Sequence, residues 1–275
     1  MMTPRSFWPH PFAFFTAMLG VPLLLAGCAA VGGDVTGSIN QPLAPLPHGA
    51  DAVRAYTTSW GDRYQAQHDN INAAMNYARG LRREHRNNQA AAVLEVAVLH
   101  HPKDRALRAE YGKALVDAGH FSQALPVLQA ASTPDHPDWS VLSAEGTIAD
   151  QIGDHVKAQS LYASALKIRP GEPSVLSNLG LSYALSRNLP AAEQVLAQAA
   201  ASPQAGERVQ QNYALVLALE GKFQQSEQVS ARNLPPAEAA ANVAAIRQMI
   251  AQSDTWKSIQ QSAPKAPSRR HHAKS

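Results

Sequence analysis

Cysteine is almost absent from this sequence, since Cys28 is the single thiol in 275 residues. One thiol cannot form a disulfide within the chain or build a cysteine-ligated metal site, so the fold must rest on an apolar core. The sequence also has no Gly-rich P-loop, no G-x-S-x-G nucleophile motif and no H-E-x-x-H zinc motif. We therefore predict no catalytic residue, no metal, no cofactor and no small-molecule substrate.

A strong charge of one sign is also lacking. The chain has 24 basic and 21 acidic residues; four of the basic ones lie in the acid-free segment 264–275, and a fifth is Arg5. The rest of the chain thus has 19 basic against 21 acidic residues. A body with a slight acidic excess lacks the broad basic face that binds nucleic acid, so we predict no nucleic-acid partner.

Residues 1–27 have the pattern of an export signal. Arg5 gives a sparse positive start, and the apolar run that begins at Phe12 is shorter than a membrane-spanning helix. The run ends in the letters LAGC, with Cys28 last, and this ending resembles the lipobox of bacterial lipoproteins. The resemblance implies cleavage before Cys28 and acylation of that residue. The alternatives are an ordinary signal peptide with a chance cysteine and a cytosolic protein with an apolar N-terminus.

Several acyl chains would hold the protein durably on a bilayer. Ala29 follows the cysteine, and by resemblance to enterobacterial sorting this favours the periplasmic face of the outer membrane. Residues 28–50 are rich in glycine, proline and small polar residues, a composition typical of a flexible tether. We therefore expect a lipid anchor followed by a body that stands away from the membrane.

A period of 34 residues runs through most of the remaining chain. Four columns recur at this spacing: Gly112, Gly146 and Gly180; Ala90, Ala124, Ala158 and Ala192; Ala97, Ala131, Ala165 and Ala199; and Leu94, Leu128, Tyr162 and Leu196. The columns resemble the tetratricopeptide pattern of paired helices, which implies an all-α solenoid. Five units follow without insertion, at 71–104, 105–138, 139–172, 173–206 and 207–240. An unspecific alanine-rich helical bundle is the alternative.

Each column has a physical role. The small residues let the two helices of a unit approach closely, and the large column is expected to fill the space between successive pairs. Gly119, Gly153 and Gly221 lie where the first helix of a unit turns into the second, a place where a positive φ is easily adopted by glycine.

Both ends of the array are expected to be capped, as solenoids require. Residues 51–70 predict a helix whose Tyr56, Trp60 and Tyr64 share one face and cover the first unit. A second capping helix is expected over 236–252, after a double proline, with a buried stripe of Val243, Ile246 and Ile250. Residues 253–275 are expected to form a disordered basic tail.

Residues 71–252 resemble the TadD family, the tetratricopeptide lipoproteins of the tight-adherence (Flp) pilus machinery. The stretches that carry the resemblance are LSNLGLSYALSRNLPAAEQVL, ERVQQNYALVLALEGKFQQSEQV and NLPPAEAAANVAAIRQMI. The resemblance implies a pilotin-like role, in which the protein helps an outer-membrane secretin reach the membrane and form its ring. The tether and the basic tail lie outside it.

A binding groove is expected on the concave face that the first helices of such units form. The predicted groove runs from basic to apolar along the chain and comprises Asn76, Arg79, Arg82, Arg83, Asn178, Leu181, Leu185, Asn212, Leu215 and Leu219. Its apolar end suits an amphipathic or extended peptide. By resemblance to other tetratricopeptide proteins, the three asparagines would bond the backbone of that peptide. The arginines would attract an acidic C-terminus.

Each part of the groove has an alternative explanation. The helix after residue 236 would fold back and fill the apolar end, the asparagines would bond within their own helix hairpins, and the arginines would form a solvated face. The sequence favours a non-catalytic assembly factor with a protein partner such as a secretin. A structural scaffold of another envelope complex, or a regulator of cell-wall enzymes held by the basic tail, are the competing functions.

Overall fold

The computed structural model describes residues 43–262, with side chains described as far as residue 252. Cys28, the export signal, most of the expected tether and residues 263–275 lie outside this part. Within it the chain forms helices and no strand, apart from one isolated bridge between Thr133 and His136. The helices are α1 (Ala50–Ala66), α2 (Ile71–Arg83), α3 (Asn87–His100), α4 (Arg105–Asp117), α5 (Phe121–Ala131), α6 (Trp139–Gln151), α7 (His155–Ile168), α8 (Pro173–Leu185), α9 (Leu189–Ala200), α10 (Glu207–Leu219), α11 (Phe223–Ser230) and α12 (Pro236–Ser262).

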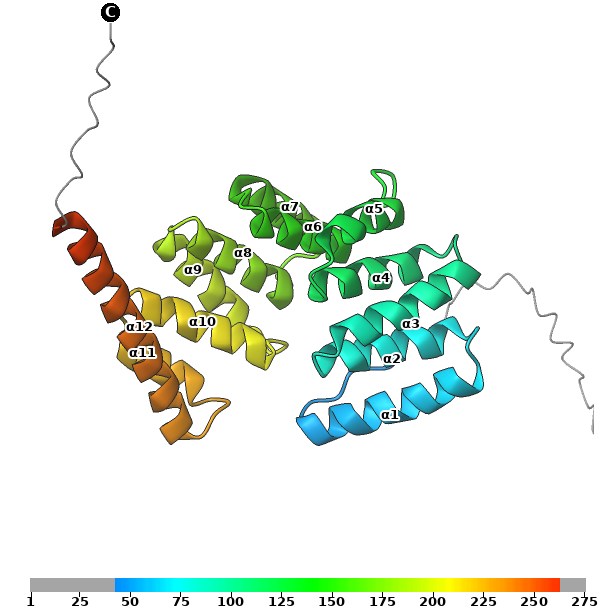
Figure 1. The fold of residues 1–275 in the computed structure, drawn as a ribbon, viewed down its shortest axis with the longest axis horizontal. Helices are drawn as coiled ribbons and strands as arrows, with labels where there is room; N and C mark the ends of the chain where they lie inside the picture. Colours follow the sequence, from blue (N-terminus) through cyan, green and yellow to red (C-terminus); the bar gives the residue numbers. More distant parts are fainter. Residues whose placement is uncertain (1–42, 263–275) are drawn as a thin grey trace, which may run out of the picture. The chain divides into compact units, whose positions relative to one another are not determined.

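The helices from α2 to α11 are arranged as five antiparallel pairs, and each pair packs on the next (Figure 1). We call the first helix of each pair helix A and the second helix B. The A helices α2, α4, α6, α8 and α10 begin 34 residues apart and also contact one another from pair to pair. The predicted all-α solenoid of helix-turn-helix repeats is therefore confirmed. None of the helices in residues 43–262 combines the length and the apolar character that a membrane-spanning helix needs.

Side-chain caps fix where most A helices begin. Asn70, Asp104 and Asp138 each accept a hydrogen bond from a backbone N–H in the first turn of α2, α4 and α6. Such caps pair N–H groups that have no partner within the helix. Pro173 begins α8, where its missing N–H costs nothing. The fifth A helix follows Gly206, which has no side chain to cap it.

The glycine column sets the distance between the helices of a pair. A Cβ atom built on Gly112, Gly146 or Gly180 would lie 2.5–2.6 Å from the side chain of Leu128, Tyr162 or Leu196 respectively. Those three side chains are 0–1% exposed. The large column thus packs on the glycine of its own pair, because the spacing of 16 residues places the two positions opposite each other across one helix hairpin. Tyr162 and Leu196 also belong to core clusters that include residues of the next pair, in agreement with the expectation that this column fills the space between pairs.

A second column lies at the turn from helix A to helix B. Gly119, Gly153 and Gly221 have φ of 79°, 84° and 80°, as expected from the sequence. The equivalent positions in the first and fourth repeats are His85 and Arg187, with φ of 60° and 63°. All five repeats therefore use the same left-handed turn, and two of them form it without glycine.

The N-terminal capping helix α1 buries Val53, Thr57, Gly61 and Tyr64, while Tyr56 and Trp60 are half-buried. The side of α1 that contacts α2 is therefore centred about one residue further along the helix than the predicted face of Tyr56 and Trp60. Residues before α1 differ from the expectation more strongly. The flexible tether was predicted to extend to residue 50, but Leu43 packs against the core and Ala44 bonds to α2. The side chain of Leu43 and the two bonded main-chain groups of Ala44 fix the residues just before α1 against the first repeat.

The C-terminal capping helix α12 packs on α10 and α11. Val243 is buried, and Ile246 and Ile250 are half-buried, in agreement with the predicted stripe. The helix continues past its predicted end at residue 252 to Ser262, so a disordered tail from 253 was wrong for its first part.

Candidate binding face

The A helices carry the residues that the sequence assigns to a binding groove. Residues from α1, α2 and α10 also line one cavity of about 640 Å³, so the first and fifth A helices approach the same space. We call the side of the A helices that bears the predicted groove residues the inner face. Its two ends differ in chemistry and are described in turn.

Asn76 is fully buried at the N-terminal end of the inner face. Its amide nitrogen donates to the carbonyl oxygen and the Oδ1 atom of Asn72, at 2.8 and 2.9 Å. Its Oδ1 atom accepts from the backbone N–H of Ala44 at 3.0 Å and from the Tyr56 hydroxyl at 2.7 Å. Asn76 therefore does bond the backbone of an extended segment, and that segment belongs to this chain.

Arg79 lies one helical turn further along α2. Its Nη1 atom donates to the carbonyl oxygen of Ala44 at 2.9 Å and to Asn76 Oδ1 at 3.4 Å. Burial raises the pKa of Tyr56, and the nearby charge of Arg79 opposes that rise. Ala44 thus has both of its main-chain polar groups paired by α2.

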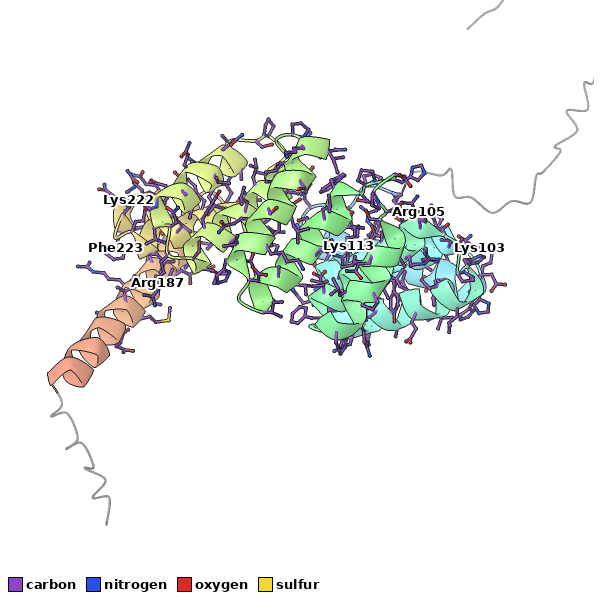
Figure 2. The ribbon with its side chains drawn as sticks, turned by 90° about the horizontal axis from the view of Figure 1, so that it is seen from above. Lys103, Arg105, Lys113, Arg187, Lys222 and Phe223 are labelled. Atoms are coloured by element: carbon purple, nitrogen blue, oxygen red, sulfur yellow. The ribbon has the colours of Figure 1, made fainter. Side chains whose placement is uncertain are left out.

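The next residues of the inner face form an ionic cluster centred on Glu110. Its carboxylate contacts Arg82 at 3.1 Å and Lys113, labelled in Figure 2, at 2.6 Å. Arg82 also contacts Asp117 at 2.7 Å. Burial alone would raise the pKa of Glu110, but the charges of Lys113 and Arg82 outweigh burial and hold that pKa below its ordinary value. Arg82 is therefore committed to carboxylates of the chain itself.

Arg83 is exposed and lines the 640 Å³ cavity together with Arg54, Arg208 and two glutamates. One of these, Glu84, pairs with Arg86. The cavity wall thus carries both signs of charge. The arginines that the sequence grouped as one basic cluster take different roles: Arg79 bonds Ala44, Arg82 forms internal ion pairs, and Arg83 faces the cavity.

Asn178 and Asn212 occupy the same repeat position as Asn76 but bond differently. Asn178 donates to Ser143 Oγ at 3.2 Å, and Asn212 donates to Ser177 Oγ at 2.9 Å. Each bond runs to the A helix of the preceding repeat. These two amides therefore tie neighbouring A helices together, neither within their own hairpins nor onto an extended segment.

The C-terminal end of the inner face is apolar. Leu181 is half-buried, while Leu185, Leu215 and Leu219 are 57%, 36% and 41% exposed. Leu215 and the α12 residues Val243 and Ile246 line one cavity of about 360 Å³, so the C-terminal helix lies near Leu215 with open space between them. The alternative that this helix fills the apolar end stays a prediction, and Leu185, Leu215 and Leu219 are exposed.

Two polar groups that sequence reasoning passed over organise the inner face. Glu110 is the first, and a carboxylate at the position held by asparagine in three other repeats was its only signal. The second is a network in which Asp150 accepts from Tyr162 at 3.0 Å, Ser182 at 2.7 Å and the His155 ring. Among the described residues no cluster of His, Cys, Asp or Glu could hold a metal.

Comparisons with known proteins agree with this arrangement. A family model described as tetratricopeptide repeat matches residues 81–144. Among curated proteins, no sequence matches this chain. Solved structures similar to it include the Cut9–Hcn1 hetero-tetramer of the APC/C, with TM-score 0.56 and 16% identity over 70% of this chain. This chain spans 40% of the Cut9–Hcn1 chain that it matches.

Two further solved structures are matched over most of their own length. PilW, a widely conserved type IV pilus biogenesis factor, has TM-score 0.56 and 17% identity over 70% of this chain and 91% of its own. TTC0263, a thermophilic TPR protein of Thermus thermophilus, has TM-score 0.53 and 20% identity over 61% of this chain and 91% of its own. At these identities the similarity concerns the fold. The chain has the all-α tetratricopeptide-repeat fold, an architecture suited to protein–protein interaction.

Proposed function

We propose that this chain is a non-catalytic, membrane-anchored scaffold of the bacterial envelope that binds a protein partner during assembly of a pilus secretin. The protein-binding part of this proposal rests on the fold and on the inner face. The anchor rests on Cys28 and the LAGC ending, and the pilus setting rests on the resemblance to TadD proteins. PilW illustrates that a fold of this kind serves pilus biogenesis in another protein.

The observation that carries the binding role is the pair Leu185 and Leu219. They occupy equivalent positions 34 residues apart, at the ends of α8 and α10, and they are 57% and 41% exposed. These two helices contact each other directly. Two aligned leucines on neighbouring A helices offer anchor points to an apolar partner segment, and burying each would contribute about 1–2 kcal/mol.

The proposed binding is tested with Leu185→Arg combined with Leu219→Arg in the full chain. Both side chains are substantially exposed, so the double variant should keep its helical content and melting temperature. Capture of the secretin from detergent-extracted envelopes should fall at least about tenfold, because the anchors are lost and charge enters the contact. Undiminished capture of the secretin would refute the role of this end of the inner face.

A matched control comes from exposed apolar residues of the B helices. Leu99 and Val156 are 76% and 80% exposed on α3 and α7. Leu99→Arg combined with Val156→Arg adds the same charge without touching the A helices, and it should leave capture unchanged. Recovery of other envelope proteins, or of cell-wall hydrolases, in place of a secretin would favour the competing functions.

The proposed anchor is tested by Cys28→Ser. This variant should move the protein from the membrane pellet to the soluble fraction, because the acylated residue is gone. Labelled fatty acid should be incorporated by the natural chain and not by the variant. Continued labelling of the variant would exclude Cys28 as the acylation site.

A further inference from the structure

The segment before α1 lies in contact with α2. Residues 43–47, with the sequence Leu-Ala-Pro-Leu-Pro, have no regular secondary structure. Four of the five are half-buried, and Pro45 is exposed. Leu43 packs against the hydrophobic core that α1 and the first three repeats share. The segment therefore lies against the protein along most of its length, with Pro45 on the outside.

The polar contacts with this segment go to main-chain atoms. Asn76 Oδ1 accepts the N–H of Ala44 at 3.0 Å, and Arg79 donates to its carbonyl oxygen at 2.9 Å. A pair of bonds to the N–H and the C=O of one residue recognises the main chain and does not depend on the side chain of that residue. The site should therefore select a peptide by its extended main chain and by a small residue at the bonded position. It should select less by polar side chains.

The amide of Asn76 is oriented by bonds that do not involve the segment. Its nitrogen donates twice to Asn72, and Tyr56 donates to its oxygen. Asn76 is 0% exposed, so its geometry is fixed by the protein around it. The acceptor that receives the Ala44 N–H is therefore built into the first repeat and positioned independently of the segment, which limits the ordering cost of binding.

The sequence of the segment suits the site. Pro45 confines Ala44 to extended geometry, because a proline disfavours the helical region for the residue before it. A proline-interrupted chain also loses little conformational entropy when it binds in an extended form. Leu43 supplies the apolar contact, and alanine allows close approach of its peptide group.

We propose that the first repeat is a binding site for an extended, proline-containing apolar peptide, and that residues 43–47 of the same chain occupy it as an intramolecular ligand. The chain's own segment binds at an effective concentration on the order of millimolar, so a separate peptide of the same chemistry competes poorly with it. The site is distinct from Leu185 and Leu219, and the proposal does not depend on the identity of the partner bound there.

The test is a competition in the full chain with a fluorescent peptide of sequence QPLAPLPHG. Ala44→Pro removes the N–H that bonds Asn76 and leaves the helices untouched, whereas Ala44→Ser keeps that N–H and serves as the control. The labelled peptide, followed by fluorescence anisotropy, should bind Ala44→Pro about three- to tenfold more tightly than the natural chain, in proportion to one lost hydrogen bond. Ala44→Ser should bind it like the natural chain.

Two further measurements locate the binding. Adding Arg79→Ala to Ala44→Pro should remove the gain in affinity. A peptide with N-methylated alanine lacks the same N–H and should bind Ala44→Pro about three- to tenfold more weakly than the unmodified peptide does, and this measurement needs no change to the protein core. The proposal is overturned if Ala44→Pro binds the unmodified peptide no more tightly than the natural chain, or if N-methylation leaves the affinity for Ala44→Pro unchanged.

Discussion

The first two repeats and the last two repeats share one packing scheme and differ on the inner face. Equivalent positions hold Arg79 and Lys113 in α2 and α4 but Leu181 and Leu215 in α8 and α10. Lys113 pairs with Glu110 and Arg79 donates to Ala44 and Asn76, so both cations have partners within the chain. The two leucines remain partly exposed. The glycine column and the first alanine column hold small residues throughout, with Ala78 and Ala214 in place of glycine and Ser226 in place of alanine. The difference teaches that packing positions are fixed by the hairpin, whereas inner-face positions are free to diverge.

The charged and the apolar ends of the inner face should also differ in how much stability is lost when one polar side chain is removed. Glu110 holds the charged end together through Lys113 and Arg82, and the carboxylate is largely buried. At the equivalent place Asn178 and Asn212 each make one neutral bond to a serine of the preceding repeat. A buried charge with two partners should therefore matter more than a neutral amide with one.

The largest effect is expected for Glu110→Ala. Removing the carboxylate leaves Arg82 and Lys113 without their shared partner and opens a small cavity, so the free energy of unfolding should fall by about 3 kcal/mol. Urea denaturation followed by circular dichroism measures this loss. Asn212→Ala at the same repeat position should cost about 1 kcal/mol. Equal losses for the two variants would remove the distinction between the two ends.

How far this difference was predictable depends on how far apart in the chain the partners lie. The repeat columns are local and periodic, so the sequence indicated the helix pairs and the turn glycines Gly119, Gly153 and Gly221. The basic-to-apolar gradient was also visible. The partners of Arg82, Glu110 and Asp117, lie 28 and 35 residues later in the chain. The repeat period alone does not show that the side chains at these positions contact each other.

The segment at 43–47 shows the same limit more clearly. Its glycine- and proline-rich context favoured a flexible tether, because composition reports how stiff a chain is and not what it contacts. Ala44 bonds Asn76 across 32 residues of sequence, and its neighbour Leu43 packs against the core. Asn76 was expected to bond the backbone of a partner peptide, which stays a prediction, and an intramolecular occupant was not considered. Whether the predicted groove residues bind a partner stays a prediction.

Acid should weaken the charged end selectively. The pKa of Glu110 lies below the ordinary 4.5, so its ionised form stabilises the folded state. That contribution is fully present above about pH 4.5, the value expected in the unfolded chain, and is lost as the pH falls through the lower pKa of the folded state. Thermal melts from pH 7 to 3 should show a smaller loss of stability for Glu110→Gln than for the natural chain. The effect should be smaller than that of Glu110→Ala, since a protonated carboxyl still fills its place.

Glu145 in α6 provides a control of opposite sign. Burial raises its pKa, and the charge of Lys157 opposes that rise only in part. Its ionised form therefore disfavours folding at neutral pH, and the penalty is relieved as the pH falls through the raised pKa towards 4.5. Glu145→Gln should steepen the loss of stability on acidification, whereas Glu110→Gln should flatten it. Parallel changes in both variants would contradict these assignments.

The smallest effect concerns the turns, where the comparison is between repeats with and without glycine. His85 and Arg187, the latter labelled in Figure 2, adopt φ of 60° and 63°, which costs an L-residue about 1–2 kcal/mol. Glycine avoids that strain but loses more backbone entropy on folding, by about 0.5–1 kcal/mol. His85→Gly and Arg187→Gly should each raise the free energy of unfolding by about 0.5 kcal/mol, the difference between these two terms.

The reverse change tests the same balance from the other side. Gly153→Ala places a Cβ at φ of 84° with no atom within 4 Å of it, so any loss of stability reports backbone strain and not a steric clash. We expect a loss of about 1 kcal/mol in chemical denaturation. If His85→Gly and Arg187→Gly are destabilising while Gly153→Ala behaves as expected, then the His85 and Arg187 side chains contribute more than the strain they impose. The first and fourth repeats would then owe their turns to side-chain contacts, and the common turn column would not by itself make the five repeats equivalent.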